Sequence, residues 1–370
     1  MESSEGIDWE TGSDLQPLIC IQRRRAEGAR RTTMHTAQAS SPCHLRTMRD
    51  ILCSLCILVS AASFAGAQEG QELPPPGGTL KVTTAVVNVY AVVRQKNGRL
   101  IPDLNKDDFL VEEDQKPQVI RYFARETETP LTMGILVDTS PSQDRVLEVE
   151  KTEAEAFLRE VMRPKDLTFV LHFDVEVELL QDFTADLHML DKAIEETEIN
   201  GGGVRTPGTF PSGDSGGATH LYDAVYLSAR ELLKNEVGRK VLILLTDGED
   251  QGSKVKLEAA LEAAQKSDVI IYSIDISDRA FYSRHGMGYG GESVLHKLSD
   301  ETGGRVIQAN NAKDTSVAFQ QIANELRTQY LLGYTPTNTK LDGTFRKIEV
   351  KLRNGNAKVN ARRGYYAPEG

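Results

Sequence analysis

Cysteine is absent from most of this chain, and aromatic residues are few. The four cysteines lie at or before residue 56, Trp9 is the only tryptophan, and aromatic residues make up 6% of the 370 residues. Disulfides and thiolate metal sites are therefore excluded from the main body of the protein. An excess of positive charge is also lacking, because the formal net charge is −11, and this argues against nucleic-acid binding. The remaining composition, 39% hydrophobic and 26% charged, is typical of a globular protein.

A short apolar segment near the N-terminus predicts export. The apolar run 51–62 is shorter than the ~20 residues that a membrane-spanning helix needs. Arginines precede it and the small residues at 65–67 follow it, which is the layout of a secretory signal peptide. We therefore expect a signal peptide at 48–67, cleaved near Ala67. The mature protein should be secreted or held in the periplasm or cell envelope, without a transmembrane span.

Residues 1–47 precede this signal peptide, although a signal peptide normally stands at the N-terminus. The stretch is polar, irregular and rich in Arg, Ser and Thr. We expect it to be untranslated or disordered. Translation would then start at Met34 or Met48 rather than at Met1.

The first part of the mature chain predicts β structure. Residues 68–78 are rich in Pro and Gly and predict a linker. Residues 79–128 form the N-terminal part of an accessory β domain, in which Asn97-Gly98 supplies a hairpin turn. Two further strands are expected at 109–113 and 119–123.

Apolar strands alternate with amphipathic helices over residues 129–329, which predicts a doubly wound α/β fold with a mainly parallel sheet. The link between the strands at 167–174 and 177–183 is so short that this pair must be antiparallel. Residues 330–370 alternate again between apolar and polar positions. They should pair with 79–128 in a flanking β-sandwich-like domain, on the side of the sheet away from its carboxyl edge. The other expected strands are 131–138, 240–247, 268–277 and 304–309, and the expected helices are 144–162, 185–198, 221–234, 254–267, 292–302 and 314–329.

Following the chain direction through these elements brings three segments to the carboxyl edge of the sheet, where such folds bind ligands. They carry Asp138, Ser140, Ser142, Thr219 and Asp247. Two carboxylates and three hydroxyls suit a hard cation, Mg²⁺ above all, with Mn²⁺ or Ca²⁺ as alternatives. Neutral hydroxyls leave the cation electron-poor, so it would attract an acidic group of a partner. A set of helix caps and strand ends without a metal is the structural alternative.

The same segments resemble a known family. The sequences DTSPS at 138–142, GATHLYDAV at 217–225 and LLTDGED at 244–250 resemble the metal-ion-dependent adhesion site of von Willebrand factor A domains. The resemblance implies that Ser140, Ser142 and Thr219 ligate the metal directly or through water. Asp138 and Asp247 would ligate it directly or hold bound waters.

The flanking segments resemble the exported bacterial VWFA-related family. They are IPDLNKDDF at 101–109, LGY at 332–334 and RGY at 363–365. Pro141 stands where many members have Gly, and it implies a stiffer loop around the same site.

Two loops, at 200–218 and 279–291, should frame the metal face. Their aromatic and Arg side chains are the usual types at binding hot spots, although loops without a role are equally open. The candidates for partner contact, together with the residue after Thr219, are Arg205, Phe210, His220, Phe281, Tyr282, Arg284, His285 and Tyr289.

Motifs of enzymes occur but lack their partners. GDSGG at 213–217 resembles a protease nucleophile segment without a matching histidine motif, and Asp138 lacks the second Asp of aspartyl phosphatases. His172 is expected to be a core or edge histidine. We therefore expect an exported binding protein, not an enzyme, that binds a protein or envelope polymer with an exposed carboxylate. The alternative is a metal-stabilised structural or scaffold protein of the envelope.

Overall fold

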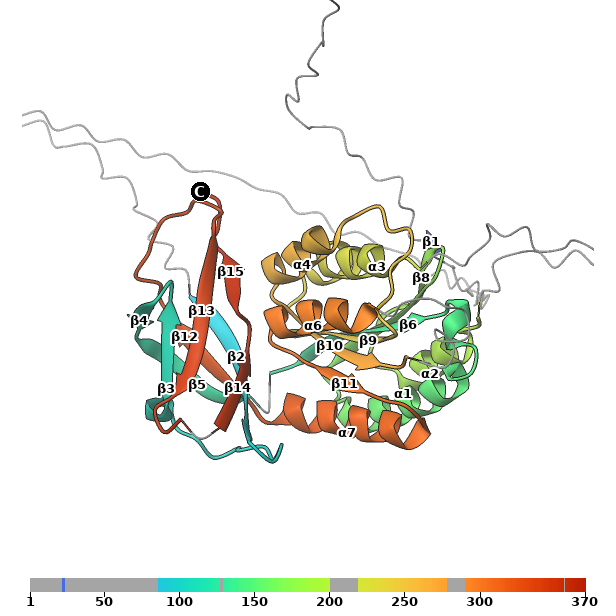
Figure 1. Ribbon diagram of the computed structural model, residues 1–370, viewed down its shortest axis with the longest axis horizontal. Helices are drawn as coiled ribbons and strands as arrows, with labels where there is room; N and C mark the ends of the chain where they lie inside the picture. The colour runs from blue at the N-terminus through green and yellow to red at the C-terminus, as the bar shows by residue number, and fades with distance from the viewer. Residues whose placement is uncertain (1–21, 24–85, 127–128, 200–218, 278–289, 356) are drawn as a thin grey trace, which may run out of the picture. The chain divides into compact units, whose positions relative to one another are not determined.

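The computed structural model describes residues 22–23, 86–126, 129–199, 219–277, 290–355 and 357–370. These residues belong to one compact unit. It contains a seven-stranded sheet flanked by helices, and two four-stranded antiparallel sheets (Figure 1). The predicted α/β class and the additional β structure are confirmed. None of the helices in the described part of the chain combines the length and apolarity needed to cross a bilayer.

The central sheet is built on strands that are apolar on both faces. All eight residues of β6, Leu131–Asp138, are buried, and this strand pairs in parallel with β7 and β9. The antiparallel pairing of β7 with β8 agrees with the short link between them. The strand order is β1-β8-β7-β6-β9-β10-β11. The bounds of the other strands are Gln22–Arg23 (β1), Leu167–Phe173 (β7), Val177–Thr184 (β8), Arg239–Thr246 (β9), Val269–Asp275 (β10) and Val306–Gln308 (β11).

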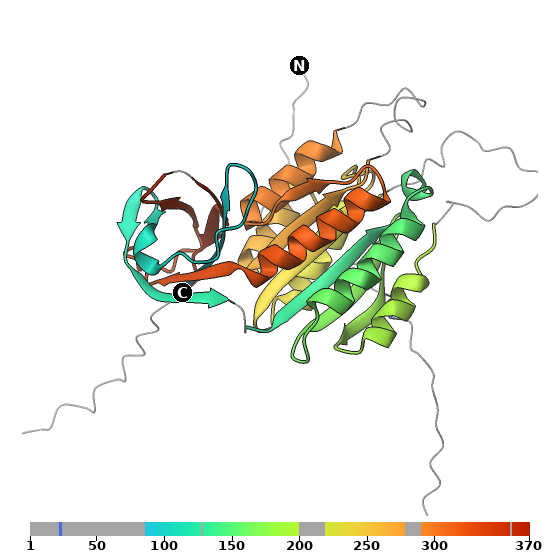
Figure 2. The same ribbon diagram turned by 90° about the horizontal axis from the view of Figure 1, so that it is seen from below.

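Helices cover both faces of this sheet (Figure 2). On one face, α1 (Leu147–Val161), α2 (Leu187–Glu195) and α7 (Ala312–Arg327) pack against the side chains of alternate β6 residues. On the other face lie α3 (Leu221–Leu227), α4 (Leu257–Lys266) and α6 (Gly291–Thr302). The segment Ser228–Leu233 continues α3 as a π-helix. Such double coverage explains why the strands lack a polar side.

The two antiparallel sheets combine strands from before and after the α/β region. The orders are β14-β2-β12-β5 and β15-β13-β3-β4. Thus β2 pairs with β12 and β14, and β3 pairs with β13, as the alternating patterns predicted. The strands are Val87–Gln95 (β2), Phe109–Glu113 (β3), Lys116–Gln118 (β4), Ile120–Glu126 (β5), Gln329–Tyr334 (β12), Phe345–Leu352 (β13), Ala357–Ala361 (β14) and Gly364–Tyr366 (β15).

The expected turn at Asn97-Gly98 forms, but the hairpin after it is very short. Gly98 has φ of +87° and donates its N–H to the carbonyl of Gln95. A single bridge, Arg94 to Leu100, joins the two arms. Pro102 follows two residues later and has no N–H with which to continue the ladder.

The tyrosines of the LGY and RGY segments meet inside this β structure. The hydroxyls of Tyr334 and Tyr365 both donate to Oε2 of the buried Glu113, at 2.7 and 3.1 Å. The Arg346 guanidinium lies 3.9 Å from the other carboxylate oxygen. These residues therefore tie the C-terminal strands to β3 and are remote in sequence from the predicted metal ligands.

The two antiparallel sheets, which form the β-sandwich, contact the α/β region at the amino ends of the strands of the seven-stranded sheet. Arg94 on β2 pairs with Glu325 near the end of α7 at 2.7 Å. The side-chain amide of Asn360 donates to the carbonyl of Gly304, just before β11. Both contacts lie at the edge opposite to the end of β6. Within the described residues, the sandwich therefore leaves the carboxyl edge uncovered, as expected.

Candidate metal centre

The carboxyl edge of the sheet brings two carboxylates together. Asp138 is the last residue of β6 and Asp247 follows the last residue of the adjacent strand β9. Their exposed fractions are 0% and 1%, and those of Ser140 and Thr219 are 3% and 5%. Carboxylates are rarely buried to this degree without a charge partner or strong hydrogen bonds.

The loop backbone orients Asp138. Its Oδ1 accepts a hydrogen bond from the N–H of Ser140 at 2.9 Å, and its Oδ2 accepts one from the Thr246 hydroxyl at 2.6 Å. The same Thr246 oxygen accepts the N–H of Gly248 at 3.0 Å. One hydroxyl thus links the ends of both strands and fixes the direction of the Asp138 carboxylate.

The turn after β9 places Asp247. Oδ1 of Asp247 accepts the N–H of Glu249 at 3.1 Å. Gly248 between them has φ of +81°, a conformation that favours glycine. A side chain at Gly248 would also meet the carbonyl of Gly291 and the side chain of Leu295. The turn can therefore lie tightly against the start of α6.

The serines of the DTSPS segment lie side by side. The 3₁₀ turn Pro141–Gln143 follows Ser140, with Pro141 at its first position. It brings the hydroxyls of Ser140 and Ser142 to 3.0 Å from each other. The turn also delays the helix, so α1 begins at Leu147 and not at 144 as predicted.

Thr219 is held by backbone contacts on two sides. Its carbonyl accepts the N–H of Gln251 from the segment after β9, and the N–H of the next residue, His220, donates to the carbonyl of Asp174, both at 2.8 Å. His220 is the N-cap of α3 and is half-buried. Thr219 therefore belongs to the same edge as Asp138 and Asp247.

The electrostatics of this edge favour a bound cation. Burial, and then the charge of Asp247, raise the pKa of Asp138 to about 7, against the hydrogen bonds from Ser140 and Thr246. A divalent cation would remove this penalty by neutralising both carboxylates. No group of three His, Cys, Asp or Glu side chains in ligand geometry occurs among the described residues, so a cation held here would also need hydroxyl or water oxygens as ligands. That donor set fits Mg²⁺, which keeps several waters and prefers oxygen.

Two further buried polar residues near this edge were missed from the sequence. Gln143 and Glu150 are both 0% exposed. Burial, followed by the charges of Asp138 and Asp247, raises the pKa of Glu150 well above its usual range. The signal in the sequence was a glutamate at an inward position of the apolar pattern of α1.

His172 is a half-buried residue of β7 that contacts the loop beside Asp138. Its Nδ1 lies 3.1 Å from the Thr139 hydroxyl and its Nε2 lies 3.3 Å from Glu178. A carboxylate, an imidazole and a hydroxyl in line resemble a catalytic triad. However, Thr139 is fully buried and donates to Asp174 at 2.8 Å, so its hydroxyl is inaccessible to a substrate.

The other candidates for partner contact lie outside the described residues, as does the GDSGG segment at 213–217. They are Arg205, Phe210, Phe281, Tyr282, Arg284, His285 and Tyr289.

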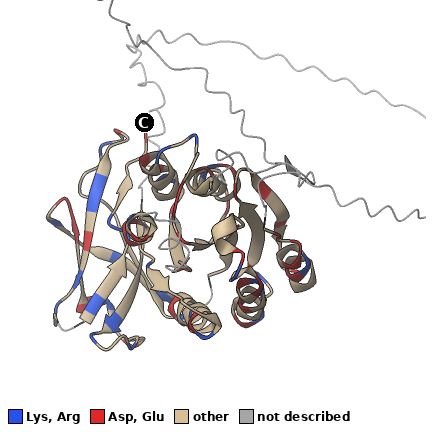
Figure 3. Cartoon of the chain, turned by 45° about the vertical axis from the view of Figure 1, so that its right-hand side comes forward, with Lys and Arg blue, Asp and Glu red and all other residues tan. Residues whose placement is uncertain are grey.

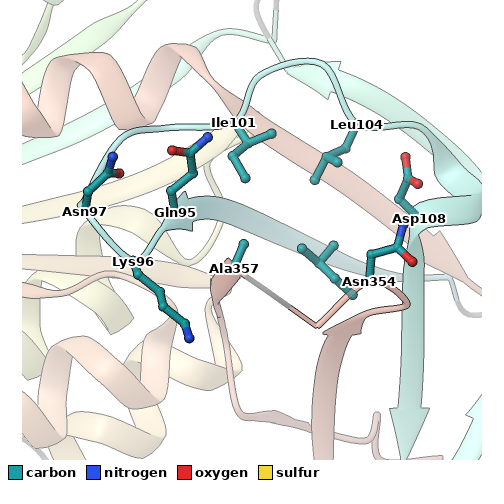
Figure 4. Close-up of a pocket in the computed structure, with 9 residues that line it drawn as sticks. Gln95, Lys96, Asn97, Ile101, Leu104, Asp108, Asn354 and Ala357 are labelled. Carbon is teal, nitrogen blue, oxygen red and sulfur yellow. The ribbon is translucent and has the colours of Figure 1, made fainter.

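A cavity of about 510 Å³ lies at one end of the β-sandwich, where it is lined by residues from the end of β2 and the start of β14 (Figure 4). The charged residues in its lining are Lys96 and Asp108. Asp108 already accepts the N–H of Asn105 at 2.7 Å, in the cap of a short 3₁₀ turn.

Comparison with known proteins supports the resemblance. Residues 212–325 match the sequence model of the von Willebrand factor type A domain. The chain contains a von Willebrand factor type A domain. The matched range of this vWA domain includes Thr219 and Asp247, whereas the DTSPS segment precedes it on the neighbouring strand.

Relatives of the vWA domain are distant. An uncharacterized protein of Borreliella burgdorferi is 23% identical over 210 residues, which cover 52% of this chain and 57% of that protein. The chain thus spans little more than half the length of this curated relative. Among solved structures, proximal thread matrix protein 1 from the mussel byssus is 15% identical, with a TM-score of 0.44 and coverage of 58% of this chain and 51% of that one. A von Willebrand factor type A protein of Catenulispora acidiphila is 12% identical, with a TM-score of 0.42 and coverage of 71% and 74%.

Proposed function

We propose that this protein is an exported vWA-type binding protein whose Mg²⁺ site recognises an acidic group on a protein or an envelope polymer. Asp138, Ser140, Ser142, Thr219 and Asp247 would hold the cation directly or through water. The observation that carries the proposal is the burial of two carboxylates at the ends of adjacent strands, beside a pair of serine hydroxyls 3.0 Å apart.

The charges at this site explain why the partner would be acidic. Two carboxylates neutralise one divalent cation, and the hydroxyls add no charge. A coordination position that the chain leaves open would still favour a hard oxygen ligand, such as the carboxylate of a partner. A bound cation would act as the Lewis acid that binds the carboxylate of the partner. The chain would hold this cation at an edge of the sheet that the sandwich does not cover.

Binding is favoured over catalysis because His172, which contacts the loop beside Asp138, has no accessible nucleophile. His172 contacts Thr139, which is buried and already donates to Asp174. We also propose that the segment 48–67 directs export and is removed near Ala67. Acidic and basic residues both occur on the sandwich strands and on the outer helices (Figure 3), a mixture unlike the basic stripe of a nucleic-acid-binding surface.

The test is a calorimetric titration of Mg²⁺ into the purified protein and into Asp138→Ala. Asp144→Asn is the matched control, because Asp144 is an exposed carboxylate in the same loop. We expect saturable binding at a single site in the wild type and in the control, and none in Asp138→Ala. Wild-type protein that takes up no divalent cation would contradict the proposal.

A second titration separates the binding protein from a metal-stabilised scaffold. A site that serves recognition should lose its cation to a chelator while the fold persists. A scaffold should instead unfold, because a structural metal contributes its binding free energy to folding. Far-ultraviolet circular dichroism in excess EDTA distinguishes these outcomes at room temperature.

A further inference from the structure

Glu150 occupies an unusual position on α1. Its helical neighbours on the same face, Ala154, Phe157 and Val161, belong to the apolar core between α1 and the sheet. Glu150 is 0% exposed, and neither of its carboxylate oxygens has a hydrogen-bond partner among the described residues. A buried carboxylate in this state is costly, so it calls for a partner that the protein chain does not supply.

The metal edge lies within electrostatic range of Glu150. After burial itself, the charges of Asp138 and Asp247 are what raise the pKa of Glu150. Both carboxylates therefore act on Glu150 from the interior of the protein, where charges are weakly screened. Glu150 lies in the first turn of α1, which begins five residues after Ser142, so it belongs to the same end of the sheet as Asp138 and Asp247.

Gln143 gives independent evidence that this region can bind a polar ligand or water. It is the last residue of the 3₁₀ turn Pro141–Gln143 and precedes Glu150 by seven residues along the chain. Its Nε2 donates to the hydroxyl of Ser142 at 3.3 Å, so its amide group stands against a predicted metal ligand. Its Oε1 is also buried and has no hydrogen-bond partner among the described residues. Gln143 and Glu150 therefore each present a buried acceptor, and the described chain offers neither of these acceptors a donor.

We propose that Glu150 is a third acidic residue of the cation site, which together with Gln143 accepts hydrogen bonds from water molecules held by the cation. This inference rests on the proposed function. Glu150 is a positioning residue and not a ligand, because no three acidic or histidine side chains in the described chain gather in ligand geometry. Water on Mg²⁺ is a strong donor, and Mg²⁺ retains several waters when it binds to proteins. A buried acceptor behind these waters both orients them and adds negative charge.

The negative charge of Glu150 should also strengthen the binding of a dication. Without a cation, the region contains carboxylates that repel one another in a poorly solvated interior. A dication relieves that repulsion. Removal of any one carboxylate therefore reduces the free energy that is gained when the cation binds. Substitution of a residue that orients metal ligands or bound waters usually weakens metal binding about 10- to 100-fold.

The experiment compares Mg²⁺ affinity in Glu150→Gln with that of the wild type, by calorimetry on the purified full chain. Glutamine keeps the size of the side chain and removes its charge. Glu148→Gln is the matched control on the same helix, since its side chain is 84% exposed. We expect about tenfold or greater weakening of Mg²⁺ binding in Glu150→Gln and no change in the control.

Thermal unfolding in EDTA separates this role from a structural one. Glu150→Gln should unfold at the same or a higher temperature than the wild type when no cation is bound, because a buried carboxylate has been removed. A residue needed only for packing would give the opposite result. Glu150→Asp retains the charge and should still bind Mg²⁺, and its comparison with the wild type keeps the proposal testable if the Gln variant folds poorly.

Equal Mg²⁺ affinity in the wild type and in Glu150→Gln would overturn the role of Glu150 and leave the proposed function standing. A wild-type protein that binds no divalent cation would overturn both.

Discussion

Replacement of Asp138 by Asn should stabilise the cation-free protein at high pH. Burial and the charge of Asp247 raise the pKa of Asp138 from 3.8 to about 7. Because the pKa of Asp138 is raised in the folded state, the stability that protonated Asp138 allows is fully present below pH 3.8. This stability is lost as the pH rises to about 7. Each tenfold change in proton affinity is worth about 1.4 kcal/mol, so the penalty above that pH is at most roughly 4 kcal/mol.

The assay is urea unfolding in EDTA at several pH values between 4 and 8, for the wild type and Asp138→Asn. Asparagine can still accept the N–H of Ser140, and the Thr246 hydroxyl can rotate to accept from the amide. The difference between the two proteins isolates Asp138 from the other carboxylates that titrate. We expect Asp138→Asn to gain up to about 4 kcal/mol relative to the wild type between pH 4 and 8. A difference that is independent of pH would refute the reasoning.

The remaining predictions concern single hydrogen bonds. Thr246→Val removes the donor to Oδ2 of Asp138 and should destabilise the protein by about 1.5–3 kcal/mol at pH 8 in urea unfolding, while weakening Mg²⁺ binding; an unchanged Mg²⁺ affinity would mean that Thr246 does not orient the ligand. Tyr334→Phe removes a donor from the buried Glu113, to which Tyr365 also donates, and should cost about 1–3 kcal/mol of stability. Calorimetry should show unaltered Mg²⁺ affinity in Tyr334→Phe, since the tyrosine lies in the sandwich.

The architecture was predictable because the strands of a doubly wound sheet are apolar on both faces. β6 and β9 are both largely apolar, β6 ends in an aspartate and β9 is followed by one, and this pattern located both the sheet centre and its carboxyl edge. The very short link before β8 correctly predicted its antiparallel direction. Periodicity and connection length are local properties, so they can be read without knowledge of the fold.

The start of α1 was predicted less well. Ser140-Pro141 begins a 3₁₀ turn, and this turn displaces the helix start to Leu147. Its geometry depends on the contact between Ser140 and Ser142, which periodicity does not register.

Glu150, which we propose as part of the site, shows why sequence patterns alone did not identify it. A glutamate within an apolar helical pattern indicates either a break in the buried face of the helix or a buried carboxylate with a functional role. The choice depends on which groups lie opposite, and these come from β6 and from the turn after β9, about a hundred residues later in the chain. Long-range juxtaposition of this kind becomes visible only in the folded structure.

The most direct test of the central claim is a titration of Mn²⁺ followed by electron paramagnetic resonance, in which the signal of free Mn²⁺ falls as the ion binds. The wild type should remove one Mn²⁺ per chain from solution and release it when Mg²⁺ is added in excess. Asp247→Asn should bind far more weakly, because one of the two buried carboxylates is lost. If the free Mn²⁺ signal were the same with the wild type, with Asp247→Asn and with buffer alone, the carboxyl edge would not be a metal centre.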